Sequence, residues 1–219
     1  MMGAMSHLLR IELPDVPGSL GAVATAIGDV GANIEAIEIV EHRRDGKAVD
    51  DVFVELSPDV MPDMVVSAVQ RLDGVRVMWV SRYAAGGNLH LDLEAVEMIT
   101  DDPSSAIATL TDLMPKTFRC DWALAIGQEG DKVTQLAATP AAPGIPEPLA
   151  TWFPLPKPAR PQVGEWSGWS ATAVAAAPLG APERIIVFGR HGGPDILDSE
   201  LARLGHLATL AASIESAAT

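Results

Sequence analysis

Residues 14–33, PDVPGSLGAVATAIGDVGAN, decide how the first part of this chain folds. The preceding stretch, LLRIEL at 8–13, alternates apolar and polar residues and predicts a strand. Pro14 and Pro17 end that strand, because each proline removes a backbone donor and fixes φ. Gly18 then allows a tight turn, and apolar residues follow it at helical spacing.

The predicted helix has recognisable ends. Ser19 is a suitable N-cap, and Gly31 is a suitable stop beyond the last turn. Asn33 then leads into IEAIEIVEH, an Ile-rich stretch that predicts the second strand. The segment therefore predicts strand, turn, helix and strand in succession.

The pattern continues to residue 83. Residues 43–47 contain an Asp-Gly turn, and 48–57 return as a strand with Val52, Val54 and Leu56 on one face. Pro58 and Pro62 precede a second helix, and 75–83 form a fourth strand. We expect that helix to bury Met64, Val65, Ala68, Val69 and Leu72. The order is βαββαβ, the ferredoxin-like arrangement of four antiparallel strands with two helices on one face.

Two helices leave one side of the sheet uncovered. We expect Phe53, Ile37 and Trp79 to line that side or an edge. Apolar residues on such a face predict that a partner subunit or the second domain packs there.

A family resemblance rests on two motifs in this frame. D-x-P-G-x-L follows the first strand and G-x-N-I precedes the second, so residues 7–84 resemble an ACT domain, an amino-acid-sensing regulatory module. The resemblance implies domain bounds of 1–86, a homodimer, and an amino acid held between paired domains. It also implies ligand contacts from Asp15, Val16, Gly18, Ser19, Leu20, Asn33 and Ile34. Leu13 stands where serine-binding relatives are often polar, which argues against a serine-like ligand and leaves room for an apolar one.

Elementary chemistry also supports ligand binding at the loop 15–20 but leaves an alternative open. The first N–H groups of a helix have no partner within it and favour an anion, and Asp15 could receive an ammonium group. Alternatively, Pro-Gly is an ordinary turn, Asp15 only caps it, and Asn33 tolerates left-handed geometry. Some ACT-like domains bind nothing and only mediate pairing.

Residues 87–219 show a different pattern, after a joint at 84–88. We expect a helix over 92–114 broken at Pro103, a hairpin over 120–139, and an irregular loop at 140–161, where eight prolines exclude a helix or a central strand. Paired strands at 170–179 and 183–191 and a last helix capped by Asp198 complete the chain. This second domain resembles a small GAF-like α/β domain with a central antiparallel sheet, so the whole chain is predicted to be α+β.

Few features of the second half suggest a site. Trp152, Trp166 and Trp169 could stack on a ligand, although closure of a small core is the commoner role of such aromatics. Cys120 heads an apolar strand and is expected to be inert. The sequence around Arg190 and His191 precedes a Gly-Gly turn, where a solvated loop is the ordinary interpretation.

Composition and motifs exclude several functions. The formal net charge of −14 is shared by both halves, with 7 basic and 13 acidic residues in 1–86 and 8 and 16 in 87–219. Both halves would repel nucleic acid and anionic lipid. We find no secretory signal, membrane span, metal-ligand spacing, cofactor motif or catalytic constellation, so neither metal nor cofactor is expected.

Together these observations predict a cytoplasmic, non-catalytic, allosteric regulatory protein that binds an amino acid. The single cysteine agrees with a reducing compartment. The alternative is an interaction module without a ligand, acting as a detached regulatory subunit of an enzyme or regulator.

Overall fold

The computed structural model describes residues 5–82 and 88–218. The chain divides into two compact units, Met1–Gly87 and Asn88–Thr219. The predicted joint at 84–88 lies almost wholly outside the described residues, as does Tyr83 at the end of the predicted fourth strand.

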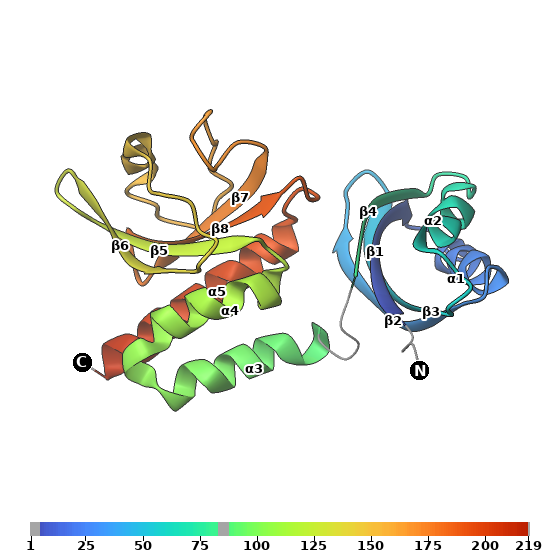
Figure 1. Cartoon of the computed structure of the whole chain (residues 1–219), viewed down its shortest axis with the longest axis horizontal. Coiled ribbons are helices and arrows are strands. Elements are labelled where there is room, and N and C mark those ends of the chain that lie inside the picture. Colours follow the sequence, from blue (N-terminus) through green and yellow to red (C-terminus); the bar gives the residue numbers. More distant parts are fainter. Residues whose placement is uncertain (1–4, 83–87, 219) are drawn as a thin grey trace. The chain divides into compact units, whose positions relative to one another are not determined.

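The first unit has the βαββαβ order that its sequence predicts. Its sheet runs β2-β3-β1-β4 with every pair antiparallel, and α1 and α2 cover the same face (Figure 1). The elements are β1 (Met5–Pro14), α1 (Ser19–Asp29), β2 (Ala32–His42), β3 (Lys47–Leu56), α2 (Pro62–Gln70) and β4 (Arg76–Arg82).

The core of this unit lies between the sheet and the helices. Leu9 on β1 pairs with Val52 on β3, which pairs with Ile37 on β2, and all three face the helices. Ile37 lies on the edge strand β2, one of the two places expected for it, but it faces the helices rather than the uncovered side, because register shifts in β2 turn it inward. Met64 is 45% exposed rather than buried, since it lies in the first turn of α2 beside the buried stripe.

The other face of the sheet carries Phe53 and Trp79, as predicted: Phe53 pairs with Leu8, and Trp79 pairs with Arg10. Arg10 donates from Nε and Nη2 to the two carboxylate oxygens of Asp51, at 2.7 and 2.9 Å. That a partner subunit or the second domain packs on this face stays a prediction.

The helix caps differ from the sequence-based expectation by one residue. Gly18 occupies the N-cap position of α1 and Ser19 is its first helical residue. Likewise Leu197 precedes α5, and Asp198 begins it. Glu200 makes the capping contact instead, because its Oε2 accepts a hydrogen bond from the Leu197 N–H at 2.9 Å.

The second unit is a four-stranded antiparallel sheet of order β6-β5-β8-β7, with α4 and α5 packed on one face and α3 beside them (Figure 1). The predicted α+β class, with an antiparallel sheet in each part, is confirmed. The elements are α3 (Asn88–Asp101), the 3₁₀ helix η1 (Pro103–Ser105), α4 (Ala106–Phe118), β5 (Trp122–Glu129), β6 (Lys132–Ala138), the 3₁₀ helix η2 (Glu147–Trp152), β7 (Thr172–Leu179), β8 (Ala181–His191) and α5 (Asp198–Ala217).

The Pro-rich loop crosses the face of this sheet that the helices leave open. Its residues pack on β5, β7 and β8 in a separate apolar cluster. The expectation of no regular structure was wrong at one point: Glu147–Trp152 form η2, since Pro148 lies near its start, where a missing donor costs nothing.

Candidate functional site

The loop between β1 and α1 forms a tight, anchored turn. The Asp15 N–H donates to the Gly46 carbonyl at 2.9 Å, and the Ser19 N–H donates to the Val16 carbonyl at 3.2 Å. Gly18 has φ +95°, in the left-handed region that favours glycine, and nothing lies within 4 Å of the place a Cβ would take. Glycine is therefore required here by backbone conformation rather than by space.

The start of α1 presents free backbone donors. Leu20 and Gly21 lie in the first turn, where an N–H has no acceptor within the helix, and neither donates to another protein group in the described ranges. The positive end of the helix dipole acts at the same place. An anion such as a carboxylate could be held by these groups.

Other predicted loop residues have defined neighbours. The Asp15 carboxylate lies 2.8 Å from Nδ1 of His42, a residue that sequence reasoning did not connect with the site. Val16 is 58% exposed, so its apolar side chain stands at the surface. Leu20 is half-buried and packs against the core of the first unit, as does Ile34 at the start of β2.

Asn33 lies far from the loop in the same chain. Pro14 pairs with Lys47 at the start of β3, whereas Asn33 pairs with Glu55 near its end. Eight residues of strand separate those positions, or about 26 Å. Asn33 also lies on the face away from the helices, because its neighbour Ala32 is in the helix-side core. One copy of the chain therefore does not bring the two halves of the predicted site together.

A buried carboxyl near the loop was not anticipated. Asp50 on β3 is 2% exposed, and its Oδ1 atom has no hydrogen-bond partner among the described residues. Burial raises the pKa of Asp50, His42 opposes that shift, and the negative charges of Asp15 and Asp51 add to it. Adjacent residues in a strand point to opposite faces of the sheet, and nothing in the sequence indicated that both Asp50 and Asp51 would be buried.

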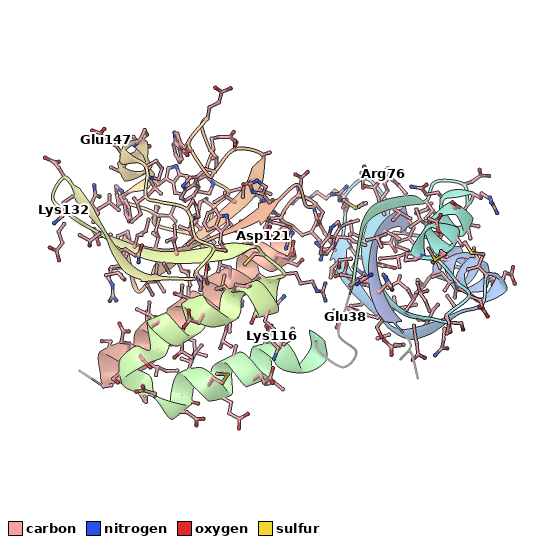
Figure 2. All side chains as sticks on the ribbon, viewed as in Figure 1. Glu38, Arg76, Lys116, Asp121, Lys132 and Glu147 are labelled. Carbon is pink, nitrogen blue, oxygen red and sulfur yellow. The ribbon has the colours of Figure 1, made fainter. Side chains whose placement is uncertain are left out.

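A charged cluster lies on the opposite face of the same strands. Glu12 is 4% exposed. Its carboxylate accepts hydrogen bonds from Nη1 of Arg43 at 2.6 Å, Nζ of Lys47 at 2.9 Å and Nη2 of Arg76 at 3.3 Å. Arg76, at the start of β4, is labelled in Figure 2. The hydrogen bond from Lys47 is the main reason that the pKa of Glu12 lies below its usual value, while burial works in the other direction.

The site-like residues of the second unit have structural roles. Arg190 is buried, and its guanidinium donates to Glu200, to the Phe118 carbonyl and to the Pro194 carbonyl. The His191 N–H donates to the carboxylate of Asp121, which Figure 2 labels. The sequence Arg190-His191 thus joins the end of β8 to neighbouring elements.

The aromatic residues of the second unit form a core. Trp169 is fully buried, lies within 6 Å of Trp122, Trp152 and Trp166 between ring centroids, and donates from Nε1 to the Gly144 carbonyl at 2.9 Å. The commoner role expected for them, closure of a small core, is the one observed. Burial raises the pKa of the Cys120 thiol to about 12, which keeps it protonated and unreactive at neutral pH.

Two further kinds of feature concern metal ions and membranes. Residues 5–82 and 88–218 contain no group of three or more His, Cys, Asp or Glu side chains placed to hold a metal ion. Among the helices of this part of the chain, none combines the length and the apolar character needed to cross a bilayer.

Comparison with known proteins identifies the first unit. The family model for the ACT domain matches residues 7–75. Residues 7–75 form an ACT domain. A 78-residue stretch is 38% identical to NAD-dependent malic enzyme 1 of Bacillus subtilis (strain 168); the match covers 35% of this chain and only 18% of that enzyme. ACT domains are regulatory rather than catalytic modules, so the coarse prediction of a regulatory module is supported for this part of the chain.

GAF domains are found among the solved structures similar to the rest of the chain. The GAF domain of a putative sensor histidine kinase from Pseudomonas syringae pv. tomato has a TM-score of 0.45 and 18% identity, with 59% of this chain and 87% of that chain covered. The nlh2 GAF domain of A. aeolicus in an inactive state has a TM-score of 0.43 and 13% identity, covering 60% and 96%.

Proposed function

We propose that this protein is a non-catalytic amino-acid sensor whose ACT domain binds a free amino acid between two copies of the chain. The observation that supports this most is the anchored turn within the ACT domain. Gly18 holds a left-handed conformation there, and the N–H groups of Leu20 and Gly21 are free, within the described ranges, to receive the α-carboxylate.

The separation of the loop from Asn33 supports a site shared by two copies. Within one chain they lie at opposite ends of the 11-residue helix α1, about 16 Å in length. If two ACT domains pair with their α1 helices reversed, the loop of one copy meets Asn33 of the other. A two-fold axis then generates two equivalent sites.

Regulation follows if the amino acid prefers one arrangement of the domains. A ligand shifts a conformational equilibrium only by its difference in affinity for the two states. In this proposal the ACT domain receives the signal, and the second unit is the output or a second sensor. The single buried cysteine suits a reducing compartment such as the cytoplasm.

Isothermal titration with each proteinogenic amino acid tests the proposal. We expect one amino acid, or a chemically similar group, to bind the wild type, and we expect Gly18→Val and Asn33→Ala to weaken binding. Light scattering at the same concentrations should report a dimer. The absence of any binding, or undiminished binding by both variants, would refute the proposal.

An interaction module without a ligand is the second candidate. Several large apolar side chains of the first unit are exposed, a feature that fits docking onto an enzyme or regulator: Val16, Ile39, Met61 and Met64. Recovery of a stoichiometric protein partner, together with no response to any amino acid, would favour it.

A further inference from the structure

We propose that the carboxylate of Asp50 receives the ammonium group of the bound amino acid. This inference rests on the proposed function and assigns a new member of its site. Asp15, the acid in the loop itself, is already engaged, because its Oδ2 lies 2.8 Å from Nδ1 of His42.

The register of the sheet places Asp50 beneath that ion pair. Ala48 pairs with Leu13 on one side and with His42 on the other, one row before the Pro14–Lys47 pair that ends β1 at the loop. Asp50 lies two residues further along β3 on the same face, or about 7 Å deeper. This is the face that α1 and α2 cover, at the end of the sheet where α1 begins.

The Oδ1 atom of Asp50 lacks the partner that a buried carboxylate needs. It has almost no contact with solvent and accepts no hydrogen bond in the described part of the chain. An unpaired buried charge is strongly disfavoured, so such a group binds either a proton or a cation. An ammonium group offers three hydrogen-bond donors and a positive charge. On binding, it would donate to Oδ1 of Asp50 the hydrogen bond that this atom lacks within the described residues.

The surroundings of Asp50 favour a zwitterion over a simple cation. The free N–H groups at the start of α1 attract a carboxylate, and Asp50 attracts an ammonium, so both poles of an α-amino acid find a counterpart. The described residues hold no cluster of ligands for a metal ion in competition.

In this proposal the amino acid reaches Asp50 past the exposed pair of Asp15 and His42. The side chains of Asp15 and His42 are 44% and 63% exposed. An exposed pair of this kind contributes little to stability, so a ligand can displace it at small cost. We therefore place the ammonium between the loop and the sheet, with the amino-acid side chain directed toward the exposed Val16.

Titration of the full chain with the twenty proteinogenic amino acids, and with the deaminated analogue of whichever binds, tests the inference. The variant is Asp50→Asn, which keeps the shape and removes the charge. Asp59→Asn, at an exposed position beyond β3, is the matched control. Urea unfolding verifies that each protein is folded.

We expect Asp50→Asn to lose about 10- to 100-fold in affinity for the amino acid, the range for a hydrogen bond to a charged group. Asp59→Asn should bind like the wild type. The deaminated analogue should bind wild type and Asp50→Asn equally weakly.

The experiment distinguishes failure of the role of Asp50 from failure of the proposed function. Wild-type binding that Asp50→Asn leaves intact, or equal wild-type affinity for the amino acid and its deaminated analogue, would overturn the role of Asp50 alone. If no amino acid binds the wild type, the proposed function fails, and the role of Asp50 fails with it.

Discussion

His42 and Asp15 join the end of β2 to the loop before α1, with Nδ1 and Oδ2 2.8 Å apart. The pair bridges residues 27 positions apart in the sequence, and both side chains are exposed. The pair therefore engages Asp15, the acid that the loop motif suggests for an ammonium group, while adding little to the stability of the fold. The deeper acid, Asp50, keeps an oxygen without a hydrogen-bond partner in the described part of the chain.

The left-handed backbone of Gly18 makes its replacement costly. Gly18→Ala should lower the free energy of unfolding by about 1–2 kcal/mol, because a Cβ at φ +95° is strained even with open space around it. Urea unfolding followed by circular dichroism measures the change.

Gly21 provides the matched control, since it lies within α1 and also has nothing within 4 Å of the place where a Cβ would stand. Gly21→Ala should raise stability by about 0.5–1 kcal/mol through helix propensity. Equal effects of the two substitutions would contradict a conformational role for Gly18.

The raised pKa of Asp50 predicts a pH-dependent stability. The folded state binds its proton more tightly than the unfolded state, whose Asp pKa is about 3.9. This contribution to stability is present below that value and is lost as pH rises through the higher folded pKa. Asp50→Asn removes the ionisation, so the variant should gain stability relative to wild type across this window.

The measurement is the difference in unfolding free energy between wild type and Asp50→Asn from about pH 4 upward, in steps of about half a unit around the unfolded pKa. Taking the difference cancels the titrating groups that do not interact with Asp50, whereas the interactions of His42 and Asp15 with Asp50 are part of the measured effect. A difference that does not change with pH would show that Asp50 ionises normally in the folded protein.

The sequence predicts the first unit well because its apolar residues repeat with the periods of strands and helices. It fails where local geometry breaks the repeat. Register shifts in β2 place Ile37 on the helix side, opposite to strict alternation from Ile34. The burial of Asp50 could not be predicted either, because a polar residue at a core position looks like a surface residue in the alternation of apolar and polar residues.

The candidate site was only partly predictable for a related reason. The loop 15–20 is contiguous, so its turn can be derived from Pro17 and Gly18. The contact of His42 with Asp15 and the distance from the loop to Asn33 depend on the pairing of strands, which a single sequence does not state.

The cluster around Glu12 should be sensitive to charge and salt. Glu12→Gln should lower stability by about 1 kcal/mol at pH 7, because the cations of Arg43, Lys47 and Arg76 lose their shared partner while remaining partly hydrated. The pKa of Glu12 is lowered in the folded state, so its contribution is present above the unfolded pKa and is lost as pH falls through the folded value.

Urea unfolding at pH 7 and at pH 3, each at low and high salt, checks this expectation. The effect should shrink at pH 3 and in about 1 M salt. Glu41→Gln is the control, since the Glu41 carboxylate approaches one of the same cations, Nε of Arg43, at a longer distance of 3.6 Å. An effect of Glu41→Gln as large as that of Glu12→Gln would argue against a central role for Glu12.

The buried pair of Arg190 and Glu200 should be the most sensitive ionic contact of the second unit. Nη2 of Arg190 donates to Oε1 of Glu200 at 2.8 Å, and both side chains are less than a tenth exposed. Arg190→Met would leave the Glu200 carboxylate buried without this cation and free the Phe118 carbonyl at the end of α4. We expect a loss of about 3–5 kcal/mol in unfolding free energy. Arg184→Met, which breaks the more exposed contact with Glu215 at 3.1 Å, should cost less than about 1 kcal/mol. Thermal and urea unfolding of both variants compares the two losses, and similar small losses would mean that the buried pair is energetically neutral.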